Sequence, residues 1–189
     1  MADPLLRLLL SARRGNQAAA VQFWNDCAPG LHALALSVLN DHAAAEDTLQ
    51  RVVCRALEMP RHRLRAIEDI RAWLARAVRN DALNQRRERA RRNARERDYR
   101  APELTAPFAS DQPLAQALDA ITQDHREVVL LKHAAGLTFD QIALALDLSR
   151  HTAASRYRAA IVRLRRELSD DDPTAHARPP DEVSHARQR

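Results

Sequence analysis

A set of polar and basic side chains with the chemistry to contact nucleic acid lies near the end of the chain. Arg can donate two hydrogen bonds to the edge of guanine, whereas Ser and Thr reach base edges or phosphate oxygens. The set comprises Arg150, His151, Thr152, Ser155, Arg156 and Arg158. Its members can act together only if one helix presents them, so the surrounding elements decide the interpretation.

The residues around this set predict a helix-turn-helix. Thr138 and Gln141 have the spacing of a capping box, which predicts a helix over residues 139–146. A two-residue turn would follow, and Ser149 would cap a longer helix that runs to about Leu168. In this motif the first residues of the second helix enter the major groove of DNA. The alternative is a plain helical hairpin with a basic surface.

Two shorter predicted helices precede the motif, one over residues 114–121 and one capped by Asp124 that ends near Gly136. Small and aliphatic side chains would hold the two helices of the motif together: Ile142, Ala143, Leu146, Leu148 and Ala153. Asp147 stands in the turn between these two helices, and Asp tolerates the left-handed conformation at some cost. These features predict a four-helix unit over residues 114–168.

The first part of the chain is also patterned as helices. We expect a short helix over residues 4–14 and a second over residues 18–39, with Val21 and Trp24 among its apolar residues. Pro29 and Gly30 are expected to interrupt the second helix.

A third helix is expected from its N-cap Asp41 to about Leu57. Its inner face would hold Ala45, Leu49, Val52, Val53 and Ala56. An Arg-rich loop follows, and a further helix is expected to begin near Asp69. The apolar side of that helix would be formed by Ile70, Trp73, Leu74, Ala77, Val78 and Leu83.

The composition predicts an all-α fold with two small helical domains joined by a flexible linker. Ala, Leu and Arg are abundant and favour helices, and the chain has only three Gly. Residues 86–100 have almost no apolar content, which indicates a frayed or extended segment. The predicted parts are a first domain over 1–92, a linker over 93–113, a second domain over 114–168 and a disordered tail over 169–189.

The charge is unevenly distributed along the chain. The net charge of +5 comes from 30 Lys and Arg against 25 Asp and Glu, and Lys132 is the only Lys. Fourteen Arg and six acidic residues lie between Arg61 and Arg100. Because guanidinium groups bind phosphates, such a segment favours a polyanionic partner, although a solvated helix face would have the same composition.

The remaining residues argue against an enzyme. The eight His have no repeated short spacing of metal ligands, and no Gly-rich phosphate loop or catalytic motif is present, so we expect no catalytic residue, metal or cofactor. Cys27 and Cys54 are expected to be buried, reduced thiols of a cytoplasmic protein. The first ten residues are too short and too charged for a signal peptide or a membrane span, so no membrane partner is expected.

The order of these motifs resembles that of the extracytoplasmic-function sigma factors of bacterial RNA polymerase. Residues 124–156 resemble region 4 of that family, which contains a helix-turn-helix. Residues 45–50, Ala-Glu-Asp-Thr-Leu-Gln, are similar to an Ala-Glu-Asp-x-x-Gln motif of region 2, and residues 73–80 to its Trp-Leu motif that ends in Asn. The resemblance covers about residues 15–92 and 114–168.

The resemblance implies a factor that binds core RNA polymerase and promoter DNA and directs transcription initiation. Region 4 would read the −35 element through the six residues at the start of the last helix. The residues implied for the −10 element are Arg61, Arg63, Arg65, Trp73, Arg76 and Asn80. The residues implied for docking on polymerase are Asp47, Gln50 and Arg51. An anti-sigma factor is a further candidate partner.

Two other functions remain open from the sequence. The chain could be a stand-alone helix-turn-helix regulator whose first half is a sensor or a dimerisation domain. It could also be a sigma-like interaction protein that binds polymerase or an anti-sigma factor without using promoters. A ligand pocket or a self-association face in residues 1–100 would favour the first of these.

Overall fold

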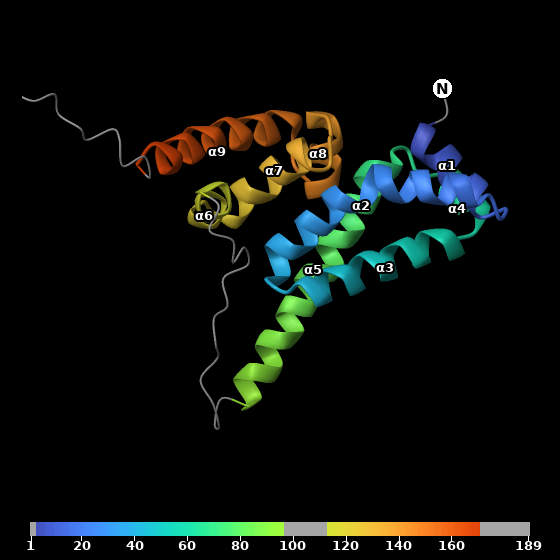
Figure 1. Ribbon diagram of the computed structural model, residues 1–189, viewed down its shortest axis with the longest axis horizontal. Helices are drawn as coiled ribbons and strands as arrows, with labels where there is room; N and C mark the ends of the chain where they lie inside the picture. The colour runs from blue at the N-terminus through green and yellow to red at the C-terminus, as the bar shows by residue number, and fades with distance from the viewer. Residues whose placement is uncertain (1–2, 97–112, 171–189) are drawn as a thin grey trace, which may run out of the picture.

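The computed structural model describes residues 3–96 and 113–170, and every regular element in these two stretches is an α-helix (Figure 1). The elements are α1 (Pro4–Ala12), α2 (Gln17–Leu39), α3 (His42–Glu58), α4 (Arg61–Arg65), α5 (Ile70–Glu96), α6 (Pro113–Ala120), α7 (Gln123–His133), α8 (Phe139–Leu146) and α9 (Arg150–Asp170). The predicted all-α fold is confirmed. The parts of the predicted linker and tail that fall in residues 97–112 and 171–189 lie outside the described residues.

Helix α2 is the centre of the first half, because α1, α3 and α5 all pack against it. Leu5 and Leu9 of α1 are almost completely buried, as is Leu34 of α2. Short polar side chains begin the helices: Asn16 accepts a hydrogen bond from the Ala19 amide at 3.0 Å. The sequence prediction of α1 is confirmed to within two residues.

Helix α2 continues through Pro29 and Gly30, so the predicted interruption is wrong. Pro29 is exposed, and water can therefore solvate the carbonyl group that the missing proline amide leaves without a partner. Gly30 is buried where α2 meets the second half of the chain, and a Cβ atom at this position would collide with the backbone of Ala134 and Ala135. The close approach of the two segments explains why glycine is tolerated inside this helix.

Several apolar side chains of the first half lie on other faces than expected. Val21 and Trp24 are 56% and 39% exposed, whereas Phe23 and Cys27 are buried. Burial raises the pKa of the Cys27 thiol to about 12. Cys54 is exposed on α3, so the expectation of two buried thiols holds for Cys27 alone.

Helix α3 follows its prediction closely. The Asp41 side chain accepts a hydrogen bond from the Ala44 amide at 3.0 Å and so caps the helix. The hydrogen bond to this backbone amide is the main reason that the pKa of Asp41 is lowered. The expected inner residues Ala45, Leu49 and Val52 are all buried.

The Arg-rich connection to α5 contains the short helix α4, which the sequence did not predict. Helix α5 then runs to Glu96, although residues 86–96 were expected to fray. This stretch consists of Arg, Glu, Ala and a single Asn, and the first three types favour helix even when they are exposed. The last turns of α5 project away from the other helices (Figure 1).

The second half contains the four predicted helices. Helix α7 begins two residues earlier than expected, because its N-cap is Thr122, and Asp124 lies inside the first turn. Gly136 has the positive φ of +66° expected at the end of this helix. Helices α6, α7 and α9 share a small core that includes Leu118, Val129 and Leu164.

The two halves of the described chain are in direct contact. Helix α2 packs on α7 and α5 packs on α8, and one cluster of buried side chains continues from Leu34 and Leu74 to Leu131 and Ile142. A buried ion pair joins Arg79 to the second half, and Figure 1 shows the two groups of helices side by side. No helix in the described stretches is both long enough and apolar enough to cross a lipid bilayer.

Candidate nucleic-acid interface

The helix-turn-helix forms as the sequence predicts. The Thr138 hydroxyl accepts from the Gln141 amide at 3.2 Å, and the Gln141 side chain accepts from the Thr138 amide at 2.8 Å. Asp147 ends α8 in the left-handed conformation with φ +59°. The Ser149 hydroxyl accepts from the Thr152 amide at 3.0 Å and caps α9. Local capping therefore fixes both ends of the turn.

The packing between α8 and α9 uses the small side chains that were expected there. Ile142, Ala143, Leu146 and Ala153 are buried, and Leu148 is half-buried against the main core. Ala153 has no exposed surface, so α9 lies close against its neighbours at this position. This contact leaves the opposite face of the first turns of α9 in solvent.

The six predicted residues on α9 divide between solvent and intramolecular contacts. Arg150, His151, Ser155 and Arg158 are exposed. Arg150 Nε lies 3.2 Å from Asp140 Oδ1 across the turn, and both side chains are 71% exposed. Thr152 is half-buried, and its hydroxyl is bonded to that of Ser149 at 2.7 Å. These side chains present a polar, basic surface at the start of the second helix.

Arg156 points toward the body of the second half. Its Nη2 atom lies 3.0 Å from Asp124 Oδ2, and only 33% of its side chain is exposed. His125 on α7 lies near Arg156 and Arg163, and burial together with these two positive charges lowers the pKa of its imidazole. Asp124 thus ties α7 to α9, which is a different role from the helix cap that the sequence predicted.

Arg61, Arg63 and Arg65 all lie on α4 and are exposed. Within the described part of the chain, none of the three is in an ion pair. Leu64 is the buried residue of this helix, and its side chain anchors α4 to the core. A five-residue helix therefore presents three guanidinium groups around a single apolar anchor.

The other predicted −10 residues lie on α5, where α8 packs against that helix. Trp73 is half-buried against the main core, which agrees with the packing role that helix periodicity favoured. Arg76 Nη2 lies 3.9 Å from Asp147 Oδ1 of the turn between α8 and α9. Asn80 is exposed. The second half of the chain therefore partly covers this face of α5.

Asp47, Gln50 and Arg51 lie together on the outer face of α3, as predicted, and all three are exposed. Arg51 Nη2 lies 2.9 Å from Asp81 Oδ2 of α5, which fixes the direction of its side chain. Gln50 is 3.5 Å from Glu46 of the same helix. This face of α3 is polar, and among the described residues Asp47 is in no ion pair.

The contacts between the halves contain polar pairs that the sequence did not predict. Arg79 Nε donates to Glu127 Oε2 at 2.7 Å, and the Glu127 side chain is only 2% exposed. Gln141 Nε2 donates to Asp69 Oδ2 at 2.8 Å. The sequence held one signal for these contacts. Glu127 directly precedes the apolar run from Val128, and a charged residue that is buried at such a position requires a partner.

The described surfaces consist of helix faces with basic and polar side chains. Across residues 3–96 and 113–170, no three or more His, Cys, Asp or Glu side chains gather in a group that could hold a metal ion. His133 contacts the Tyr157 hydroxyl at 2.9 Å on the surface between α7 and α9. The site is therefore a set of basic and polar helix faces, and it is suited to binding an extended partner.

Comparison with known proteins identifies both halves. Residues 23–92 match the family model for sigma-70 region 2, and residues 111–164 match that for sigma-70, region 4. The ECF RNA polymerase sigma factor SigL of Mycobacterium tuberculosis is 30% identical over 154 residues, which cover 78% of this chain and 87% of SigL. SigK of Mycobacterium ulcerans, also an ECF RNA polymerase sigma factor, is 25% identical over 173 residues, 86% of this chain and 92% of the relative.

Two solved structures share the fold. The sigma factor RpoE in complex with the anti-sigma factor NepR, from Bartonella quintana, superposes with a TM-score of 0.60 at 27% identity, covering 76% of this chain and 92% of RpoE. CnrH in complex with the cytosolic domain of CnrY gives a TM-score of 0.60 at 25% identity, covering 89% of this chain and 99% of CnrH.

Proposed function

The chain belongs to the extracytoplasmic-function family of RNA polymerase sigma factors, and from this membership we propose how its residues divide the work of promoter recognition. As a sigma factor it binds core RNA polymerase and promoter DNA, and its family is one of transcription initiation factors. We propose that residues 1–92 form the region 2 module, 93–113 the linker and 114–168 the region 4 module. We also propose that the chain catalyses no reaction itself and acts in the cytoplasm.

The first turns of α9 read the −35 element in this proposal. The observation that carries it is the exposure of Arg150, His151 and Ser155 on the second helix of a helix-turn-helix, where that motif meets base edges. Arg158 lies about two turns after Arg150 and would reach the phosphate backbone. Arg156 would first have to give up its ion pair with Asp124, or would contact a phosphate while keeping it.

The −10 element is held by α4 and by the face of α5 that bears Trp73, Arg76 and Asn80. The three unpaired arginines of α4 support the first part of this proposal, because phosphate binding requires basic groups that are not already neutralised. The α5 face is partly covered by α8. We therefore propose that the two halves separate when the chain joins polymerase, so that α5 becomes accessible to DNA.

The outer face of α3 docks on core polymerase. Support comes from the exposed polar side chains of Asp47, Gln50 and Arg51, which share the outer face of a helix whose inner face is buried in the core. We also propose a protein inhibitor as a partner of this chain, since the solved relative RpoE was captured with an anti-sigma factor.

Run-off transcription with purified core polymerase tests the proposed function. The full chain should direct transcripts from some members of a library of promoter fragments, and the same polymerase without it should not. Failure of the chain to join core enzyme or to direct any start site would contradict the function.

Two sets of variants then test the assignment of residues. Arg150→Ala with Arg156→Ala should weaken promoter binding by about tenfold or more and leave polymerase binding unchanged, because base contacts of this kind contribute about 1–3 kcal/mol each. Asp47→Lys should weaken polymerase binding and leave the fold intact. The matched controls are Arg165→Ala with Arg166→Ala on the far end of α9 and Glu58→Lys on the end of α3, all of which are exposed.

A further inference from the structure

A cluster of polar side chains lies where the outer face of α3 meets α5. Arg51 Nη2 lies 2.9 Å from Asp81 Oδ2, and Arg55 Nη2 lies 3.7 Å from Asp81 Oδ1. The carboxylate on α5 therefore uses its two oxygens on two arginines that stand about one helical turn apart on α3. Only 20% of the Asp81 side chain is exposed, whereas about half of each arginine side chain is. The carboxylate is the covered member of the cluster, and the guanidinium groups face solvent.

Two uncharged side chains fix the place of the Asp81 carboxylate. Gln85 Nε2 donates to Asp81 Oδ2 at 3.1 Å and to Thr48 Oγ1 at 2.6 Å. Thr48 is completely buried, and its hydroxyl donates to the carbonyl oxygen of Ala44 at 2.7 Å. Arg51 Nη2 also donates to Thr48 Oγ1, at 3.3 Å. Because these groups bond to one another, the cluster is formed before any partner protein binds.

The two arginines keep most of their hydrogen-bond donors for a partner. Within the described part of the chain, Arg51 bonds only through Nη2, and Arg55 approaches Asp81 only through Nη2. A guanidinium group carries its N–H donors in a rigid plane and can bind both oxygens of a carboxylate at once. The Nε and Nη1 donors of both side chains are thus available to carboxylate groups of another protein.

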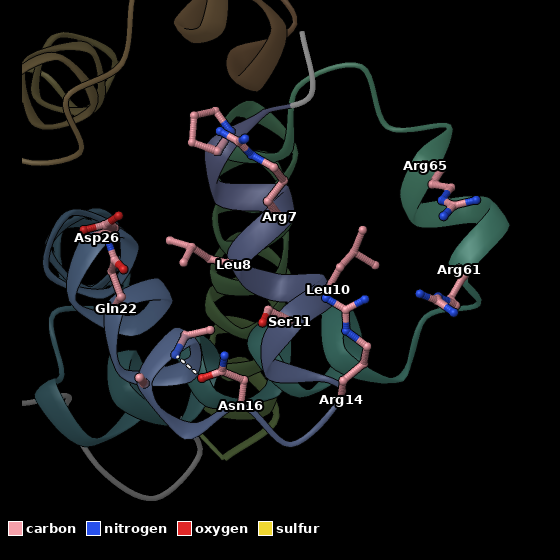
Figure 2. A pocket seen from close by; sticks show the side chains of 13 residues that line it. Arg7, Leu8, Leu10, Ser11, Arg14, Asn16, Gln22, Asp26, Arg61 and Arg65 are labelled. Atoms are coloured by element: carbon pink, nitrogen blue, oxygen red, sulfur yellow. Dashed lines mark hydrogen bonds between the residues drawn. The ribbon is translucent and has the colours of Figure 1, made fainter.

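Other exposed arginines of the first half are not held in this way. Arg14, Arg61 and Arg65 line a cleft between α1, α2 and α4 (Figure 2), and none of the three is in an ion pair with another described residue. Such side chains can change rotamer to suit a ligand. Arg51 and Arg55 are held by one carboxylate and present their donors in a fixed direction, which suits a partner surface of fixed shape.

We propose that Asp81 is a positioning residue for docking on core polymerase, and that Arg55 belongs to the docking face beside Arg51. The inference rests on the proposed function, which assigns the outer face of α3 to polymerase. Asp81 acts through the two arginines, because it holds their guanidinium groups close together, where they meet carboxylate groups of polymerase. Docking then requires little further ordering of two long side chains, whose rotamer freedom would otherwise be lost at that moment.

Net charge alone predicts the opposite effect of Asp81. A carboxylate beside two arginines cancels part of their positive charge and repels an acidic partner. If net charge decided the affinity, removal of this carboxylate would tighten binding to polymerase, whereas removal of a positioning group weakens it. Asp81→Asn removes the charge and keeps the size of the side chain, so the sign of its effect distinguishes the two explanations.

The first experiment measures the affinity of the full chain for purified core polymerase by fluorescence anisotropy, with a dye on the amino terminus of the chain. Asp81→Asn should weaken binding by about tenfold, because two arginine side chains must then be ordered on binding. Asp81→Glu keeps the carboxylate and should lose less. The matched control is Asp41→Asn, which should bind as wild type does. It breaks the 3.1 Å ion pair of Asp41 with Arg89 between the same two helices, and asparagine still caps α3.

A double-mutant cycle shows whether Asp81 acts through the arginines. Arg51→Ala with Arg55→Ala should itself weaken polymerase binding. In that background Asp81→Asn should cause no further loss, because the carboxylate has no guanidinium group to hold. A further loss of about tenfold there would overturn the proposal, since Asp81 would then contact polymerase directly or support the fold. Denaturant unfolding should show that Asp81→Asn lowers stability no more than Asp41→Asn does, because ion pairs with exposed arginines contribute little.

The other outcomes separate this inference from the proposed function. Wild-type or tighter binding by Asp81→Asn would overturn the inference, as would an equal loss in Asp41→Asn. Wild-type binding by the variant without Arg51 and Arg55 would also overturn it, because docking would then not use them. In each of these cases the wild-type chain still binds polymerase, and the proposed function stands. If the wild-type chain did not bind core polymerase, the proposed function would fail, and the inference with it.

Discussion

The first turns of α9 and the first turns of α5 both carry candidate DNA-binding residues, but the two sets differ in access. Arg150, His151 and Ser155 of α9 face solvent, away from the rest of the chain. On α5, Trp73 is half-buried in the main core, and Arg76 faces Asp147 of the other half. One candidate DNA surface is thus open in the free chain, and the other is partly covered by the second half.

The difference depends on how far apart in the sequence the residues that shape each surface lie. The exposed face of α9 follows from the Ser149 cap, the left-handed Asp147 and the small core of the motif, all within a few residues. The covering of α5 follows from residues that lie more than forty positions later, such as Glu127 and Gln141. A local pattern can therefore define a binding face, but long-range packing decides whether a partner can reach it.

Arg79→Ala is expected to have the largest effect on the difference in accessibility between the α9 and α5 surfaces. The substitution leaves the Glu127 carboxylate, only 2% exposed, with the Gln123 amide at 3.2 Å as its remaining hydrogen-bond donor. Breaking one side of a buried ion pair costs about 3 kcal/mol or more, and separation of the halves would relieve that cost. Denaturant unfolding should show the loss, and small-angle scattering should show a larger radius of gyration. Arg87→Ala, an exposed position on the same helix, should change neither quantity measurably.

Arg76→Ala tests the consequence for DNA binding. In the free chain it should leave the affinity for a promoter duplex unchanged, because α8 packs on that face of α5. In holoenzyme it should lower promoter binding by about tenfold, since one charged contact with DNA is lost. Arg150→Ala should weaken binding in both states. Equal effects of Arg76→Ala in the free chain and in holoenzyme would mean that the second half does not restrict α5, and the contrast between the two surfaces would be lost.

Gly30→Ala tests the close contact between α2 and the segment after α7. Alanine favours a helix over glycine by up to about 1 kcal/mol, so helix propensity alone predicts stabilisation. The added Cβ would collide with the backbone of Ala135, and such overpacking costs about 1–3 kcal/mol. We expect net destabilisation by about 1 kcal/mol together with a wider spacing of the halves. Gly15→Ala, at φ +88° and with open space around it, should destabilise the chain without changing that spacing. A Gly30→Ala variant more stable than wild type would contradict the prediction, because the backbone of Ala135 would then move aside at little cost.

The parts of the fold that the sequence predicted well depend on neighbouring residues. The capping box of Thr138 and Gln141, the turn at Asp147 and the cap at Ser149 are confirmed, as is the inner face of α3. Each of these is a relation between residues a few positions apart, and their side chains are sufficient to satisfy the backbone groups concerned.

Some of the errors arise from packing between distant segments. Gly30 lies inside α2, where it fits against Ala135 from the second half. Asp124 pairs with Arg156 of α9 and does not cap α7. For the candidate site, the sequence identified residue types and faces, whose roles stay predictions, but it had no means to show that α8 covers part of α5.

The smallest expected effect is that of acidic pH. It tests whether acid destabilises the packing of α7 against α9 without affecting the contact between the two halves. Burial and the charges of Arg163 and Arg156 lower the pKa of His125 in the folded chain, and Asp124 offsets this only in part. The unfolded chain therefore binds a proton on this residue more readily, so the free energy of unfolding should fall as the pH drops through about 6.5, the ordinary value for His.

His125→Gln should reduce this dependence, whereas His151→Gln, exposed on α9, should leave it unchanged. Denaturant unfolding at several pH values between about 5 and 8 measures the effect, since this range contains the titration of His. Because His125 lies between α7 and α9, hydrogen exchange in acid should increase first in those two helices and not in α3 or α5. Faster exchange in α5 at the same pH would mean that acid acts on the contact between the halves, and the two surfaces would then open together.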